Sequence, residues 1–450
     1  MSFNKKLTII ILAGFLMHFF YGIGLWFSGN SLYSINGDAP SYIQTAQNFL
    51  EQGVWSADAD LAKKPDNFRT PIFPLILLLF LKFKLSFIFL ILIQSCLMIA
   101  TSILVYVWGR KIFKEQVAFS VAFFLSIDPY LSSTFVAKSV MTEPIALFLV
   151  VIVFLSIGIF LKTKGDRYLL ISILALAIGA LLKPQILFFI VFFILAVILA
   201  KQWRNKFAWI CLIIYFSILS PWLYYNFFVL KVIQFSSVSP VTLFVTSHKF
   251  QDWQKDWQDP LYHGTYRVRC EQILGVDNPM KCFEPHNAEI LAIIGKEIIL
   301  NNPFSFALFH ISRVPRVFYH DTTIDTFYND FGIFSSINSG NDVDIIKNII
   351  KLNFYDAFFA IKNKPIWIVS LSLKFLWFLL SVLALTNFFI IWKIKKEISK
   401  LSLMLILFIL MYGAMISPHG IHRYRILIEP FILLLAFDSI RLLHQKFFQK

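Results

Sequence analysis

Charged side chains are scarce in this chain. Only 15% of its 450 residues are Asp, Glu, Lys or Arg, whereas 58% are hydrophobic and the mean hydropathy is +0.70. A soluble globular domain carries roughly 25% charged residues, so an ordinary soluble domain is excluded. Because a chain that crosses lipid must satisfy its backbone internally, we expect an all-α polytopic membrane protein.

The sequence also lacks an internal repeat, a low-complexity linker and a small-residue cleavage site after its first apolar stretch. Transporters tend to show inverted repeats, so the absence of a repeat argues against that class. The first apolar run extends from about Leu7 to Phe27 and follows Lys5 and Lys6. This run is long enough to cross a bilayer, and we predict a membrane anchor rather than a cleaved signal.

Cysteine is rare as well, with four residues in the chain. Cys96 and Cys211 lie inside predicted spans, whereas Cys270 and Cys282 lie in a more polar region. In an oxidising compartment Cys270 and Cys282 could form a disulfide, which we predict. The alternative is two free thiols in a loop.

The net charge of +15 could indicate a nucleic-acid partner, but its distribution favours membrane topology instead. Basic residues recur in short segments between apolar runs: Arg110 to Lys114, Lys162 to Arg167, Lys201 to Lys206, Lys393 to Lys396, and the tail from Arg441. If all of them are cytoplasmic, about ten crossings satisfy the positive-inside rule. We therefore predict cytoplasmic N- and C-termini and no nucleic-acid partner.

This topology predicts three regions. They are an N-terminal transmembrane catalytic module at 1–230 with a first external loop at 28–84, a small mixed or helical external domain at 231–364, and C-terminal transmembrane helices at 365–450. Within the first loop, the apolar piece Pro71 to Leu81 is too short to cross and is predicted to be juxtamembrane or re-entrant. In the external domain, Ile290 to Leu300 and Pro303 to Phe318 are predicted amphipathic helices that could lie against the membrane.

The first external loop holds a carboxylate and a guanidinium at the edge of apolar helices. Asp38 follows Gly37, where a tight turn can bring the backbone close to a ligand, and Tyr42 lies one helical turn further on. Arg69 precedes a helix start at Pro71, where the helix dipole disfavours a cation, so a partner anion is expected. The alternatives are a simple helix cap for Asp38 and an interfacial anchor for Arg69.

Three further polar positions fall on the same predicted side of the membrane. Asp128 and Glu143 flank a turn before a long apolar span, and carboxylates at that depth tend to be functional unless they only cap a helix. Lys183 stands between two runs of about fifteen apolar residues. Such a lysine either ends two helices at the surface or binds an anion such as phosphate.

The last polar turn is rich in potential cations: His419, His422, Arg423 and Arg425, with Tyr424 between the two arginines. Cations in an external loop run against the positive-inside trend, so topology does not account for them. Structural neutralisation of one arginine by Glu429 is the alternative to ligand binding.

In this order, the motifs resemble the GT-C class of polytopic glycosyltransferases. The branch that includes protein O-mannosyltransferases and the aminoarabinose transferase of lipid A is most similar. The motifs are GDAPSY at 37–42, RTPIFP at 69–74, TEP at 142–144, the Lys183-Pro184 turn, Ser220-Pro221-Trp222 with Asn226, and RYRILIEP at 423–430. The resemblance covers the N-terminal half well, the C-terminal turn fairly and the external domain hardly at all.

The resemblance implies transfer of a sugar from a polyprenyl phosphate, of the undecaprenyl-phosphate type, to an acceptor hydroxyl or phosphate at the outer face of the membrane, with inversion. Asp38 would be the catalytic base, and Glu143 would orient the donor or its cations. The donor phosphate would be bound by a set of basic residues: Arg69, Lys183, Arg423 and Arg425. The candidate substrate-binding residues are Tyr42, Asp128, His422 and Tyr424.

This chain departs from the protein mannosyltransferases in two ways. Asp38 is a lone acidic residue rather than one of an adjacent pair, and the chain has no extra lumenal sugar-binding domain. A lipid or polysaccharide acceptor in a bacterial envelope is therefore favoured over a protein, which places the enzyme in the inner membrane. No cofactor or catalytic metal is expected, since the tight ligand spacing of a zinc site is missing. A transporter, flippase or polysaccharide polymerase that handles lipid-linked sugars is the alternative function.

Overall fold

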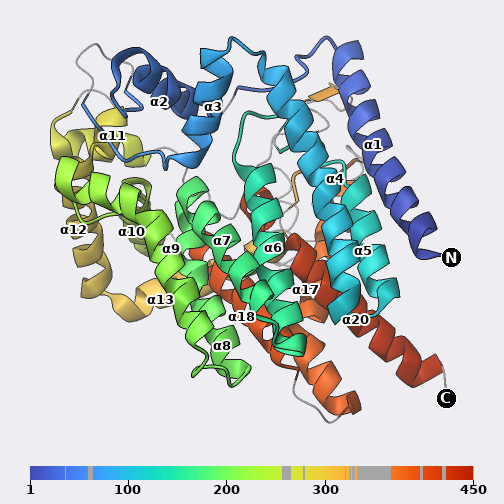
Figure 1. The fold of residues 1–450 in the computed structure, drawn as a ribbon. Coiled ribbons are helices and arrows are strands. Elements are labelled where there is room, and N and C mark those ends of the chain that lie inside the picture. Colours follow the sequence, from blue (N-terminus) through green and yellow to red (C-terminus); the bar gives the residue numbers. More distant parts are fainter. Residues whose placement is uncertain are drawn as a thin grey trace, which may run out of the picture. The chain divides into compact units, whose positions relative to one another are not determined.

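Helices form the regular structure throughout the described part of the chain, apart from one isolated parallel bridge between Ser34 and Ser139 (Figure 1). The computed structural model describes residues 1–450 except 36, 59–63, 135, 256–264, 277–278, 320, 324–325, 327–329, 332–365, 396–398, 418–421 and 449–450. It leaves out the side chains of 252–255, 265–269, 279–280, 366–367, 395 and 422. The predicted all-α fold class is confirmed.

Two compact units interleave along the sequence. The first comprises Met1–Ser34, Leu90–Val151 and Pro315–Lys450, and the second comprises Ile35–Phe89 and Ile152–Val314. Helix α6 (Glu143–Thr163) contributes residues to both units. The division predicted from the sequence, with boundaries at 230 and 364, separates transmembrane from external segments. It is a different kind of division from the two compact units, and it stays a prediction.

The first unit contains several apolar helices and one short polar helix. These are α1 (Phe3–Phe27), most of α4 (Phe87–Ile112), α5 (Glu115–Ile127), α17 (Ile366–Lys395), α18 (Lys400–Ile416), the short α19 (His422–Arg425) and α20 (Glu429–Phe448). Helix α17 packs along α20, and α5 packs against both α1 and α20. Inside the α17–α20 contact the Asn387 amide donates to the Leu435 carbonyl at 3.1 Å and to the Ser439 hydroxyl at 2.9 Å. The two bonds donated by this buried amide help to fix the register of two otherwise apolar surfaces.

The second unit contains the helices that flank Asp38 and Arg69, together with those of the 152–314 segment. They are α2 (Ala39–Gln52), α3 (Ile72–Lys82), α7 (Asp166–Leu182), the 3-10 helix η1 (Pro184–Phe189), α8 (Ile190–Leu199), α9 (Lys206–Tyr224), the π-turn η2 (Tyr225–Val229), α10 (Val238–Lys255), α11 (Thr265–Leu274), the 3-10 helix η3 (Pro279–Phe283), α12 (Pro285–Asn301) and most of α13 (Pro303–Tyr319). Helix α2 packs against α3, and α7 packs against α9. Helix α2 ends at Gly53, whose φ of 69° suits glycine.

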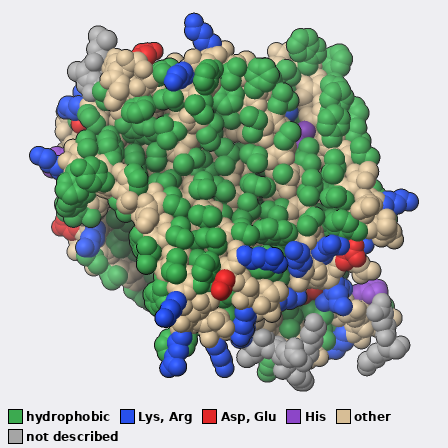
Figure 2. All heavy atoms as spheres, viewed as in Figure 1, with side chains coloured by type: hydrophobic (Ala, Val, Ile, Leu, Met, Phe, Trp, Pro, Cys, Tyr) green, Lys and Arg blue, Asp and Glu red, His purple; other side chains and the backbone are tan. Residues whose placement is uncertain are grey.

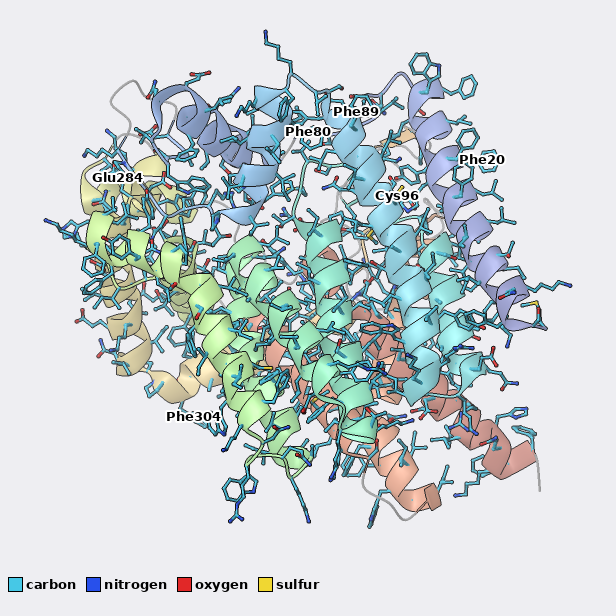
Figure 3. The ribbon with its side chains drawn as sticks, viewed as in Figure 1. Phe20, Phe80, Phe89, Cys96, Glu284 and Phe304 are labelled. Atoms are coloured by element: carbon cyan, nitrogen blue, oxygen red, sulfur yellow. A yellow bond between two sulfur atoms is a disulfide. The ribbon has the colours of Figure 1, made fainter. Side chains whose placement is uncertain are left out.

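Five helical segments in the described part of the chain are long and apolar enough to cross a membrane: Phe3–Phe27, Phe87–Ile112, Glu143–Thr163, Lys206–Val229 and Ile368–Ile394. Helices α12 and α13, which meet at a bend of 99°, would together make a sixth. Hydrophobic side chains dominate the visible surface (Figure 2), and Phe20 and Phe89, 60% and 53% exposed, point away from their helices (Figure 3). The protein is therefore a multi-pass membrane protein, whereas the number of about ten crossings stays a prediction.

The two predicted amphipathic helices of the 231–364 region correspond to α12 and α13. Cys270 on α11 and Cys282 in η3 form a disulfide, which is the pair predicted from the sequence. Both cysteines are buried with Phe244 and Leu291 in a small apolar cluster between α10 and α12. All the described elements of this region are helical.

Gly295 allows α12 to approach α10 closely. A Cβ atom added at this position would lie 3.0 Å from Cα and 3.1 Å from N of Phe244. Both atoms belong to the backbone of α10, so no flexible side chain could move aside.

We expect Gly295→Ala to lower the free energy of unfolding by about 1–3 kcal/mol, because overpacking outweighs the gain in helix propensity. Thermal unfolding of the purified protein in detergent measures this change. Lys296→Ala is the matched control, since Lys296 is the next residue of α12 and is exposed. A Gly295→Ala protein that melts at or above the wild-type temperature would contradict the close approach.

Candidate active site

Asp38 and Arg69 form an ion pair in the second unit. Asp38 follows Gly37, whose φ is 63°, and directly precedes α2. Its carboxylate lies 2.8 Å from Nη2 of Arg69, and it accepts no capping hydrogen bond from the first turn of α2. The side chains of Asp38 and Arg69 are 35% and 10% exposed. The anion partner that the sequence required for Arg69 is therefore Asp38, and the simple helix-cap alternative does not describe this carboxylate.

The guanidinium of Arg69 is held by one hydroxyl group and by two aromatic rings. Its Nε donates to the Ser41 hydroxyl at 2.8 Å. Its Cζ lies 4.3 Å from the centroid of the Tyr42 ring and 4.1 Å from that of Phe68. Arginine is the cation best suited to such stacking. Tyr42, a predicted substrate-binding residue, thus contacts the predicted phosphate-binding cation.

Lys183 belongs to the same unit and lies beside the Arg69 loop. It ends α7 in an extended conformation, with φ −144° and ψ 111°, and its side chain is buried. The hydroxyl of Thr70, the residue after Arg69, donates to the carbonyl of Leu182 at 3.1 Å. Thr70 and Leu182, which this hydrogen bond joins, are the chain neighbours of Arg69 and Lys183. The bond therefore links the backbone segments of two predicted phosphate-binding residues.

Two functional candidates in this loop could not be found from the sequence pattern. The indole of Trp55 donates to the Arg69 carbonyl at 3.0 Å, and Asp66 is a buried carboxylate three residues before Arg69. Burial raises the pKa of Asp66 to about 6, although hydrogen bonds from the Ala57 and Phe68 N–H groups oppose the rise. The one signal in the sequence is an acidic residue in the same short loop as Arg69.

The first unit contains a second cluster, centred on Glu143. This residue opens α6 and is 1% exposed, and its Oε1 accepts a hydrogen bond from Nε of Arg423 at 2.7 Å. The Arg423 side chain is 17% exposed, and its Cζ lies 5.7 Å from the ring centroid of Tyr424. The TEP and RYR motifs of the sequence therefore meet in an ion pair.

Arg425 occupies a different environment from Arg423. Its side chain is fully buried, with Nε 2.9 Å from Oε1 of Glu429 and Nη2 3.6 Å from Asp321, and it stacks on Trp377. Burial and the neighbouring carboxylates of Glu429 and Asp321 raise the pKa of Asp128 to about 8. The contacts of Arg425 with Glu429, Asp321 and Trp377 favour the structural alternative, which is neutralisation by Glu429, over binding of a donor phosphate.

The remaining predictions have mixed outcomes. Tyr424 is partly buried beside Arg423, and Asp128 accepts a hydrogen bond from the Tyr130 N–H at 2.9 Å. The His422 side chain and the whole of His419 lie outside the described residues. Within the described ranges, no group of three or more His, Cys, Asp or Glu residues could hold a metal ion. Independence of metal stays a prediction, as does the placement of both clusters on one side of the membrane.

The family model of dolichyl-phosphate-mannose-protein mannosyltransferases matches residues 64–225. This segment contains Arg69, Glu143 and Lys183, but it ends before Arg423 and begins after Asp38. No curated protein sequence matches the chain significantly.

Two solved structures resemble the fold, both from Archaeoglobus fulgidus. One is the archaeal oligosaccharyltransferase AglB in complex with an inhibitory peptide and a dolichol-phosphate, at a TM-score of 0.50 and 13% identity over 99% of this chain and 51% of that one. The other is an oligosaccharyltransferase in complex with Zn and sulfate, at a TM-score of 0.43 and 12% identity over 97% of this chain and 49% of that one. This chain thus spans about half the length of either structure. The chain has a GT-C-like helical membrane fold, and its predicted resemblance to the mannosyltransferase branch is confirmed over residues 64–225.

Proposed function

We propose that this protein is a membrane glycosyltransferase that moves a sugar from a polyprenyl phosphate to an acceptor hydroxyl. The observation that carries the proposal is the Asp38–Arg69 pair at the start of α2, with Lys183 beside the same loop. The pair supplies a partly exposed carboxylate for a proton and a fixed cation for a phosphate. The family match and the dolichol-phosphate bound to the AglB structure support a lipid-phosphate donor.

In the proposed reaction Asp38 takes the proton of the acceptor hydroxyl. The hydroxyl oxygen then forms a bond to the anomeric carbon while the bond from that carbon to the phosphate oxygen breaks, which inverts the anomeric configuration. The polyprenyl phosphate leaves with the electron pair as a stable anion, so cations matter more than a general acid. Arg69 and Lys183 neutralise this charge in a partly dehydrated setting, where electrostatic stabilisation is strongest.

The cluster in the first unit supplies a further cation. Glu143 holds Arg423 through Nε, and 17% of the Arg423 side chain remains exposed. We propose that Glu143 orients Arg423 for binding an anion such as a phosphate and that Tyr424 contacts the substrate. Arg425 is assigned a structural role, because it is enclosed by Glu429, Asp321 and Trp377.

The finer assignment is an undecaprenyl-phosphate type of donor carrying a hexose or a pentose. The acceptor is a lipid or glycan of a bacterial cell envelope, including lipopolysaccharide, because Asp38 is a lone acidic residue. We place the active site at the periplasmic or outer face of the inner membrane, with both termini in the cytoplasm.

Asp38→Asn is expected to lower sugar transfer by roughly 10²- to 10⁴-fold, since the amide cannot take the acceptor proton. Mass spectrometry of envelope lipids and glycans, from cells that lack the protein and receive each variant, measures the product whichever sugar is transferred. Binding of undecaprenyl phosphate to the purified protein should persist. Glu51→Gln is the control, because Glu51 is an exposed carboxylate on the same helix. Unchanged product with Asp38→Asn would remove the base assignment and favour a transporter or flippase.

Arg69→Ala and Lys183→Ala should each weaken binding of undecaprenyl phosphate by roughly 10- to 150-fold, the range for loss of a hydrogen bond to a charged group. Arg69→Lys should recover only part of the affinity, because an ammonium does not reproduce the stacking. Titration of the lipid phosphate in nanodiscs gives the affinity. Lys82→Ala, at an exposed lysine at the end of α3, should bind as the wild type does. Wild-type affinity in both alanine variants would refute the phosphate role.

Arg425→Met should lower the yield of folded protein, because a buried carboxylate left without its cation costs about 3–5 kcal/mol. Adding Glu429→Gln should restore part of the stability, as seen by size-exclusion chromatography and thermal unfolding. The folded double variant is then expected to keep most of its transfer activity per molecule. A folded double variant without activity would return Arg425 to the group of functional cations.

A further inference from the structure

Asp66 forms more hydrogen bonds than its position in an irregular loop requires. Only 7% of the residue is exposed. Its Oδ2 accepts from the Ala57 N–H at 2.7 Å and from the Ser56 hydroxyl at 3.2 Å, and its Oδ1 accepts from the Phe68 N–H at 2.9 Å. One carboxylate therefore joins the two ends of the loop segment between α2 and α3.

Trp55 connects Asp66 to the backbone of Arg69. The Asp66 N–H donates to the Trp55 carbonyl at 2.8 Å, and the Trp55 indole donates to the Arg69 carbonyl at 3.0 Å. Phe68, whose N–H is held by Asp66, provides one of the two rings that stack on the Arg69 guanidinium. A change in the orientation of Asp66 is therefore expected to move Arg69, both through the backbone bonds and through the ring of Phe68.

Two residues of η2, directly after α9, also form hydrogen bonds to the loop. The Tyr225 hydroxyl donates to the carbonyls of Asp66 and Trp55 at 3.2 and 3.4 Å. The Asn67 amide donates to Oδ1 of Asn226 at 2.9 Å. The loop is thus held by several hydrogen bonds, and the carboxylate of Asp66 is a buried charged group within it.

These three bonds need both oxygens of a carboxylate, because an amide of the same size has an NH2 group in place of one oxygen. Burial of an ionised carboxylate is unfavourable, so a nearby cation is expected to offset part of the cost. Burial raises the pKa of Asp66 to about 6, and the attraction between its negative charge and the nearby Arg69 opposes this rise. The charge therefore has an electrostatic partner in the residue that the hydrogen bonds also position.

We infer that Asp66 is a positioning residue that fixes Arg69 for the donor phosphate and acts only through Arg69. The inference rests on the proposed function for the phosphate-binding role of Arg69. The contact between Asp66 and the Arg69 loop is independent of that role.

The first experiment measures the chemical accessibility of Arg69, which does not depend on any activity. The full-length protein is treated with phenylglyoxal, and the modification rate of Arg69 is followed by mass spectrometry relative to the exposed Arg204 in the same molecule. Asp66→Asn should raise the Arg69 rate several-fold. Ser56→Ala, which keeps the carboxylate and removes one donor, should raise it less and covers the case in which Asp66→Asn folds poorly.

Glu284→Gln is the matched control. Glu284 lines the same small pocket as Asp66, but its carboxylate pairs with the exposed Lys64 at 3.8 Å. The control variant should leave the Arg69 rate unchanged. An unchanged Arg69 rate in both Asp66→Asn and Ser56→Ala overturns the inference.

The second experiment is a double-mutant cycle on binding of undecaprenyl phosphate. Asp66→Asn should weaken binding about tenfold in the wild-type background and less than about twofold in Arg69→Ala, because two residues that act as one unit are not additive. Equal factors in both backgrounds would show that Asp66 acts independently of Arg69 and overturn the inference. A wild-type protein that binds no lipid phosphate would instead refute the proposed function, and the Arg69 modification rate would still decide the positioning role.

Discussion

The Arg69 side chain is the group on which the arrangement of the loop between α2 and α3 depends. Its guanidinium lies over the rings of Tyr42 and Phe68 and donates hydrogen bonds to Ser41 and Asp38. Asp38 directly precedes α2, and Arg69 lies just before α3, so the ion pair joins the starts of two packed helices. Helix N-termini carry partial positive charge, and an arginine beside them increases it. The region therefore attracts anions, and Asp38 is the protein's own anion there.

The cluster around Glu143 uses the same residue types in a more buried setting. Glu143 and Glu429 are each 1% exposed, and each accepts a hydrogen bond from Nε of one arginine. Arg425 is completely buried, and its positive charge is neutralised by Glu429 and Asp321. Arg423 keeps an exposed fraction of 17%. Of two arginines that are two positions apart, one stabilises the fold and the other is accessible to a ligand.

The sequence predicted the features that depend on hydropathy and on helix ends. Apolar runs gave the helical membrane fold, and polar residues at the ends of those runs gave Asp38, Arg69, Glu143 and Lys183 as candidates. Asp66 was missed because two of its three hydrogen-bond donors are backbone N–H groups, which leave no pattern in the sequence. The separate roles of Arg423 and Arg425 depend on which one faces Asp321, more than 100 positions away in the chain.

The Asp38–Arg69 pair raises a chemical question for the proposed reaction, since a carboxylate bound to a guanidinium is a weak base. A donor phosphate is a second anion that would compete for the same guanidinium. As the phosphate draws the Arg69 charge toward itself, the attraction of Asp38 for a proton increases. Because 35% of the Asp38 side chain is exposed, an acceptor hydroxyl can approach the carboxylate. Donor binding would in this way prepare the base, and the carboxylate would remain a poor proton acceptor while no donor is bound.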